Sequence, residues 1–184
     1  RVTKRSKDFQ RNSKWPPLPG TQNEVQTIYN LIGKDKAELF TDKKAMEEVL
    51  LNWGAPKILH LATHGFFLKN EPIDFKINTA IDRGFSPQGD NDQIISPSPA
   101  YMNIENPLLR SGIVLAGANK ISITVEDTIS DGIVTSEEIL GMNLRGTEMV
   151  VLSACDTGLG EVRNGEGVFG LRRAFTQAGA KSLV

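Results

Sequence analysis

Apolar residues recur at helical spacing in four places along the chain, and several of these stretches begin or end with helix-terminating signals. Thr21 and Glu24 have the spacing of a capping box, in which a hydroxyl and a carboxylate satisfy free backbone donors, and Gly33 is a favourable helix end. A second capping box runs from Thr135 to Glu138. The pattern predicts helices over 21–32, 42–50, 135–140 and 165–178.

Short, nearly continuous apolar runs lie between these helices, as is typical of strands that are buried on both faces of a parallel sheet. The predicted strands are 37–40, 58–63, 112–116, 147–153 and 181–184. Alternating helices and buried strands predict an α/β sandwich with a mostly parallel sheet, whose ligand sites lie beyond the carboxyl ends of its strands. His64 and Cys155 both follow such a strand.

Length and composition fit one soluble globular domain. The 184 residues are 39% hydrophobic, and 21 Lys and Arg residues nearly balance 22 Asp and Glu residues, so no charge excess points to nucleic acid. We find no apolar run long enough for a membrane span and no apolar signal core, and we expect a cytoplasmic protein. Residues 1–17 are predicted to form an N-terminal arm, and the polar stretch 69–106 a long loop of unassigned role.

The chemistry-bearing residues are few, because the chain has one cysteine and two histidines. Cys155 enters the turn 156–160, which contains two glycines, and His64 precedes Gly65. A cysteine peptidase needs a thiol, an imidazole that accepts and returns its proton, and backbone donors for the oxyanion. Cys155 and His64 are the candidates for the first two, and the N–H groups of Gly65 and Cys155 are the candidate oxyanion donors.

Structural roles compete with this interpretation. A lone cysteine is often an inert core residue, and His60 lies inside an apolar run, where a structural role is the favoured one. One cysteine excludes an internal disulfide, and a zinc site built from His60, His64 and Cys155 lacks a fourth ligand. We therefore expect no zinc site.

Several stretches of the chain resemble the CHAT family, which is named for a caspase-like peptidase domain associated with TPR repeats and is related to separases and caspases. The stretches that carry the resemblance are 18–24, 58–67, 106–112, 131–139, 150–160 and 165–168. The resemblance implies a domain over 18–184 with a caspase-like three-layer sandwich, and a Cys-His dyad that falls on Cys155 and His64 and needs no metal and no cofactor. It also implies cleavage of one or a few protein partners, under control of a TPR or other sensor module in the same protein, in some members within prokaryotic defence systems.

The resemblance also shows departures from the family pattern. A strand before Leu18 and a Trp-containing acidic segment after Leu183 are not found in this sequence, so we expect a sheet that is incomplete at both ends. Asp156 is a candidate contact for a basic substrate residue before the cut, and Glu161, Glu166 and Asp127 are further acidic candidates. Two alternatives stay open: an inactive caspase-like interaction module, and another thiol-dependent activity such as acyl transfer.

Overall fold

The computed structural model describes residues 14–68, 106–120, 130–156 and 166–184, with the backbone alone at 120, 154–156 and 166–168. The described residues all belong to one compact unit. None of the helices in these ranges combines the length and apolar character that crossing a bilayer requires. The predicted loop 69–106 lies almost entirely outside the described ranges, so its role stays a prediction.

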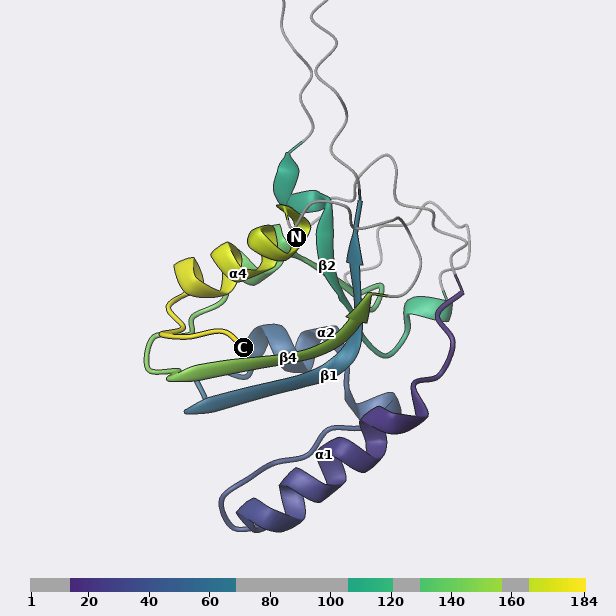
Figure 1. Ribbon diagram of the computed structural model, residues 1–184, viewed down its shortest axis with the longest axis vertical. Coiled ribbons are helices and arrows are strands. Elements are labelled where there is room, and N and C mark those ends of the chain that lie inside the picture. Colours follow the sequence, from purple (N-terminus) through teal and green to yellow (C-terminus); the bar gives the residue numbers. More distant parts are fainter. Residues whose placement is uncertain (1–13, 69–105, 121–129, 157–165) are drawn as a thin grey trace, which may run out of the picture. The chain divides into compact units, whose positions relative to one another are not determined.

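A four-stranded sheet in the order β3-β2-β1-β4 forms the centre of the fold (Figure 1). Strand β1 (Ile58–Phe67) is parallel to β4 (Met149–Asp156) and antiparallel to β2 (Ser111–Val114), which in turn is antiparallel to β3 (Ile133–Thr135). The described part is therefore α/β with an open, mixed sheet. The expected mostly parallel sheet is not found there, because two of these three strand pairs are antiparallel.

The apolar runs could not distinguish parallel from antiparallel strands. A strand is apolar throughout when helices cover both faces of its sheet, whichever way the strand runs. All four residues of β2 are buried although the strand is antiparallel to both of its neighbours. Leu183 adds a parallel bridge to Val150 at the free edge of β4, which agrees with the strand expected at 181–184.

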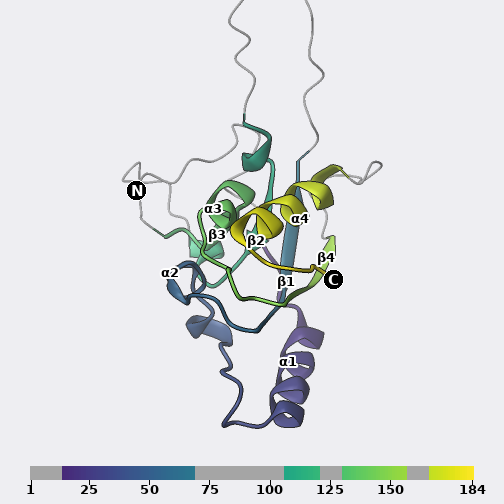
Figure 2. The same ribbon diagram turned by 90° about the vertical axis from the view of Figure 1, so that its left-hand side faces the viewer.

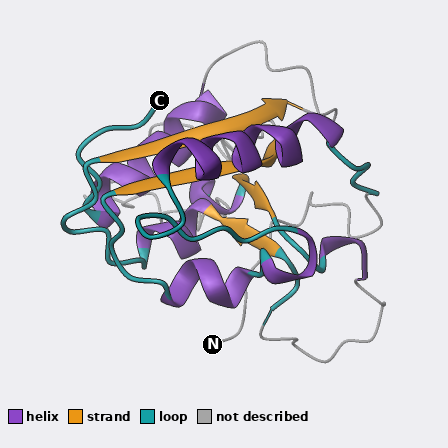
Figure 3. Ribbon diagram, turned by 90° about the horizontal axis from the view of Figure 1, so that it is seen from below, coloured by secondary structure: helices purple, strands orange, loops and turns teal. Residues whose placement is uncertain are grey.

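Helices lie on both faces of this sheet, as Figures 1 and 2 show for α1 and α4. Helix α4 (Glu166–Ala178) and helix α3 (Ser136–Leu140) cover one face, and α1 (Pro19–Ile32) contacts β1 from the other. The short helix α2 (Glu47–Asn52) completes the α-helices of the described residues, which are coloured apart from strands in Figure 3. Short 3₁₀ turns occur at η1 (Asp42–Lys44), η3 (Pro107–Leu109) and η4 (Ala118–Lys120).

Two apolar clusters fill the space between these elements. The larger cluster packs the sheet against α3 and α4, and the smaller one lies around the ends of β1 and β2. The larger contains Leu50, Ile113, Val134, Ile139, Met142, Leu144, Val150, Leu171, Ala174, Phe175, Ala178 and Ala180. The smaller contains Trp15, Phe66, Val114, Ala118 and Ile133.

The helix starting at Thr135 is confirmed with its capping box, in which the Thr135 hydroxyl accepts from the Glu138 N–H and the Glu138 carboxylate accepts from the Thr135 N–H. The capping box expected at Thr21 is wrong. Helix α1 begins two residues earlier, at Pro19, whose missing N–H suits a first turn, and the Thr21 hydroxyl instead donates to the carbonyl of Leu18.

Two other expected elements also differ. The helix expected over 42–50 is split into η1 and α2, because the carbonyl of Ala45 accepts a hydrogen bond from the N–H of Ala116 and leaves the helical path. Residues 37–40 form no strand. Conversely, β3 was not predicted, since three residues are too few for a periodic signal.

Candidate functional site

His64 and Cys155 lie opposite each other on neighbouring parallel strands. The Cα register of β1 and β4 pairs His64 with Cys155, and Gly65 with Asp156. Neighbouring strands are about 4.8 Å apart, and residues in register on parallel strands belong to the same face of a sheet. The fold thus brings together two positions that are 91 residues apart in the sequence, as the numbers 64 and 155 give.

The strand that carries His64 is longer than expected. We predicted a strand ending at Thr63 with His64 and Gly65 at its exit, but β1 continues to Phe67. The reason is β2, whose residues Ser111–Val114 pair with residues 64–67 of β1. His64 and Gly65 are therefore held between two neighbouring strands, β2 and β4.

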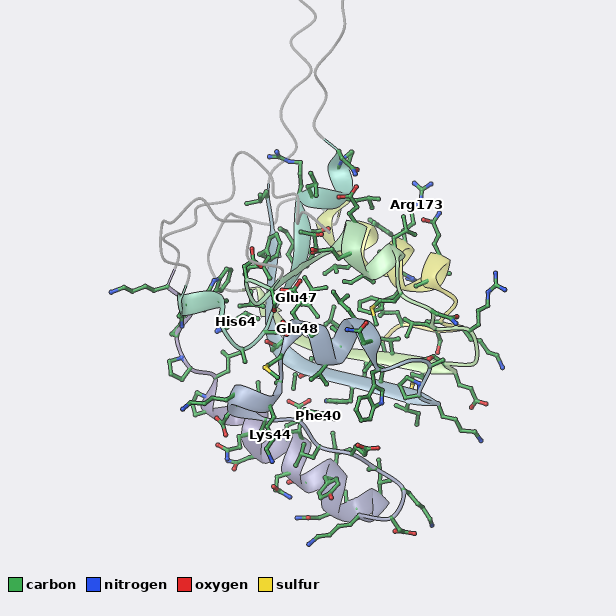
Figure 4. All side chains as sticks on the ribbon, turned by 180° about the vertical axis from the view of Figure 1, so that it is seen from behind. Phe40, Lys44, Glu47, Glu48, His64 and Arg173 are labelled. Atoms are coloured by element: carbon green, nitrogen blue, oxygen red, sulfur yellow. The ribbon has the colours of Figure 1, made fainter. Side chains whose placement is uncertain are left out.

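His64 is buried, with 5% of its surface exposed, and its imidazole contacts the segment that leads into α1. The Nε2 atom of His64 lies 2.6 Å from the carbonyl oxygen of Pro16, and the ring of Trp15 lies 5.5 Å from the imidazole ring, tilted by 45°. We call residues 14–18 the entry segment. Figure 4 shows His64 on the side of the molecule where this segment passes, away from Arg173 of α4.

The contact with Pro16 determines which imidazole nitrogen carries the proton. A carbonyl oxygen can only accept, so Nε2 donates, and a neutral His64 then leaves Nδ1 without a proton. An unprotonated ring nitrogen is what a general base needs in order to take a proton from a thiol. The imidazole is thus held in the tautomer that a Cys-His reaction requires.

The entry segment is itself held by contacts with the rest of the fold. The side chain of Asn119 accepts from the Trp15 N–H at 2.8 Å and donates to the Trp15 carbonyl at 2.9 Å. Trp15 is 7% exposed and packs in the smaller apolar cluster. A hollow of about 550 Å³ opens beside this segment, lined among the described residues by Lys14, Trp15, Pro16 and Asn119.

His60 takes the structural role expected for it. Its Nε2 atom lies 2.8 Å from Oε1 of Glu24 on α1, and Oε2 of the same carboxylate accepts from the Ser153 hydroxyl at 3.1 Å. His60 belongs to β1 and Ser153 to β4, so one carboxylate ties α1 to both strands of the parallel pair. Within the described residues, no group of three His, Cys, Asp or Glu side chains is placed to hold a metal ion.

For the other predicted site residues, the structure describes the backbone alone or nothing. The structure describes the backbone of Cys155 and Asp156 within β4 but not their side chains. Asp127 and Glu161 lie outside the described residues, and Glu166 is described only as the first residue of α4. The roles of Asp156 and of the two oxyanion donors stay predictions.

Sequence reasoning did not identify the entry segment and Asn119 as part of the site. An isolated tryptophan in an otherwise polar, proline-rich arm was a usable signal for Trp15, because such a large apolar side chain is seldom left in water. No comparable signal exists for Pro16, which acts through its backbone carbonyl, or for Asn119.

The model of one protein family, the CHAT domain, matches residues 2–184. No curated protein and no solved structure matches the chain.

Proposed function

The chain belongs to the CHAT domain family, a family related to caspase-like cysteine peptidases, and on this premise we propose that it is a cysteine endopeptidase with Cys155 as nucleophile and His64 as base. The complete caspase-like sandwich is part of the same proposal. Its substrates are one or a few protein partners, and a TPR or other sensor module in the same protein controls it.

The observation that supports the proposal best is the register of β1 and β4, which pairs His64 with Cys155. Strand alternation assigns position 155 to the same sheet face as position 153, and Ser153 reaches Glu24 of α1 on that face. His60, which contacts the same carboxylate, shares its face with His64 for the same reason. An inert thiol and a structural histidine would not have to lie in register on the same face of the sheet.

The reaction follows from the tautomer of His64. Nδ1 takes the proton of the Cys155 thiol, and the thiolate forms a bond to the carbonyl carbon of the scissile peptide. The N–H groups of Gly65 and Cys155 stabilise the oxyanion, and His64 returns the proton to the leaving amine as the C–N bond breaks. Water then hydrolyses the thioester and restores the thiol, with His64 again as the base.

Substrate preference depends on the charged residues near the dyad. Asp156 follows the nucleophile and favours a basic residue before the cut. Lys14, however, is the charged residue among the described lining of the hollow beside the entry segment, and an ammonium group there disfavours a second cation. Probes of both charges are therefore needed.

The test is covalent capture by two peptidyl acyloxymethyl ketones, one with arginine and one with aspartate next to the reactive carbon. Intact mass shows labelling, and because the chain has a single cysteine every adduct on a thiol reports Cys155. We expect labelling at pH 7 at least ten times faster than that of a free thiol. Cys155→Ala should abolish labelling, and His64→Gln should reduce it to the free-thiol rate.

The matched control is His60→Gln, which changes the other histidine and leaves the dyad intact. We expect this variant to be labelled at nearly the rate of the unsubstituted chain. Labelling no faster than a free thiol with both probes, together with unchanged cleavage of a partner protein by Cys155→Ala, would refute the peptidase and leave the inactive interaction module.

A further inference from the structure

Asn119 makes two hydrogen bonds to a single residue of the entry segment, 104 positions away in sequence. Its Oδ1 accepts from the N–H of Trp15 and its Nδ2 donates to the carbonyl of Trp15. The side-chain amide thus pairs with both backbone groups of one residue, as a neighbouring strand would. Two bonds to one residue fix the direction of the main chain as well as its position.

That direction determines where the next carbonyl points. Pro16 follows Trp15 directly, and its ring locks its own φ angle, so little freedom remains between the carbonyl of Trp15 and that of Pro16. The carbonyl of Pro16 is the acceptor for Nε2 of His64. Packing of the Trp15 ring holds the segment near His64, but ring packing alone has no preferred direction for a carbonyl.

Asn119 is anchored to the strand beside the one that carries His64. It lies in η4, where the neighbouring residue Ala118 is buried in the same small cluster as Trp15, and the Ala118 N–H donates to the carbonyl of Leu115. Leu115 directly follows β2, whose last residue, Val114, is in register with His64. The contacts therefore close a ring from β2 through Asn119, the entry segment and His64 back to β2.

We propose that Asn119 is a positioning residue for the His64 imidazole: by holding both backbone groups of Trp15, it directs the Pro16 carbonyl at Nε2 and so favours the tautomer that carries its proton on Nε2. The expected loss of catalytic rate rests on the proposed peptidase function. The expected change in the tautomer of His64 does not depend on that function. An aligned acceptor is a common way to orient a histidine, and a small displacement of such a group can lower a rate on the order of 100-fold.

Two substitutions separate the parts of the contact. Asn119→Leu has nearly the same size and removes both hydrogen bonds. Asn119→Asp keeps an acceptor for the Trp15 N–H but replaces the donor to the Trp15 carbonyl by a carboxylate oxygen, which repels that carbonyl. The matched control is Asn143→Leu, because Asn143 is also exposed and also accepts from a backbone N–H, that of Arg145, in a different part of the fold.

The direct readout is ¹⁵N NMR of the intact chain labelled at its two histidines, which reports the tautomer of each ring, with His60→Gln used for assignment. We expect a single Nε2–H tautomer for His64 in the unsubstituted chain and in Asn143→Leu. We expect exchange between tautomers in Asn119→Leu, and an intermediate shift in Asn119→Asp. With a cleaved peptide, kcat should fall about 10- to 100-fold in Asn119→Leu with little change in KM.

The outcomes separate this inference from the proposed function. If Asn119→Leu and Asn119→Asp both keep the His64 signals of the unsubstituted chain, Asn119 does not position the imidazole, whatever the chain cleaves. If the tautomer changes while Cys155→Ala leaves cleavage intact, the positioning stands and the peptidase does not. Thermal unfolding followed by circular dichroism shows which variants are folded. If Asn119→Leu does not fold, the milder Asn119→Asp provides the test.

Discussion

Replacing Trp15 by alanine removes the largest apolar contact between the entry segment and the rest of the fold. Trp15 is 7% exposed, its ring packs beside His64, and its neighbours in the smaller cluster include Phe66 and Ile133. We expect Trp15→Ala both to destabilise the protein and to release the Pro16 carbonyl from His64. The two effects share one cause, because the ring is what holds the segment on the sheet.

The magnitude follows from the buried area. A buried tryptophan removes about 200 Å² from water, which at about 25 cal/mol per Å² gives roughly 5 kcal/mol as an upper estimate. The unfolded chain already buries part of that surface, which lowers the estimate to about 3–4 kcal/mol. The segment can also leave the sheet without the rest of the fold unfolding, which limits the loss further, so we expect about 3 kcal/mol.

Urea unfolding of the intact chain measures this loss directly, and Trp53→Ala is the matched control. Trp53 is 40% exposed and contacts Phe40 edge-on with ring centroids 4.6 Å apart, so its removal should cost only about 1 kcal/mol. In a Trp53→Phe background, Trp15 is the remaining tryptophan, and its fluorescence should be poorly quenched by acrylamide. A loss below about 1 kcal/mol for Trp15→Ala, or ready quenching of Trp15, would refute the docked entry segment.

Three further substitutions test other contacts. Gly112→Ala should prevent stable folding, because a Cβ atom there would lie 2.6 Å from Cε1 of the fully buried Phe66, and circular dichroism of the purified chain measures this. Thr135→Ala removes the capping hydroxyl of α3 and should cost about 1 kcal/mol in urea unfolding, so an unchanged midpoint would contradict the capping box. Glu24→Gln removes the carboxylate that contacts His60 and should lower the free energy of unfolding by about 1 kcal/mol at most, because the pair is partly exposed. The control is Glu48→Gln, whose exposed side chain should leave the free energy of unfolding unchanged.

The sequence predicted the elements whose signals are local. The helix at Thr135 has its capping box, and strand β4 and helix α4 lie within a few residues of their predicted bounds. Where a contact distant in sequence competes with a local signal, the prediction failed. Glu24 has the spacing for a capping box, yet its carboxylate binds His60 and Ser153, since a carboxylate facing two partners on the sheet gains more than one that only caps a helix.

The same distinction between local and long-range signals applies to the candidate site. His64 and Cys155 could be named from the sequence because few residues can do this chemistry and both follow apolar runs. Their pairing in register could not, because it depends on how β4 aligns with β1, and no short-range pattern encodes that alignment. The carbonyl of Pro16 could not be found either, since every residue has a backbone carbonyl and only the fold determines which one reaches an imidazole.

The two halves of this site are held by interactions of very different strength. The positions of His64 and Cys155 are set by continuous hydrogen bonding between β1 and β4 over eight registered pairs, Ile58–Met149 through Gly65–Asp156, and slipping that register would turn every side chain of one strand to the wrong face. Among the described contacts, the imidazole is oriented by its bond to Pro16, and the entry segment behind that bond is held by the buried ring of Trp15 and two bonds from Asn119. Because local opening of a short segment costs far less than global unfolding, the entry segment can leave His64 while the sheet stays intact. It follows that a substitution that loosens the entry segment should lower the proposed activity by more than its loss of stability alone explains, and that a partner bound to this segment would change the orientation of His64.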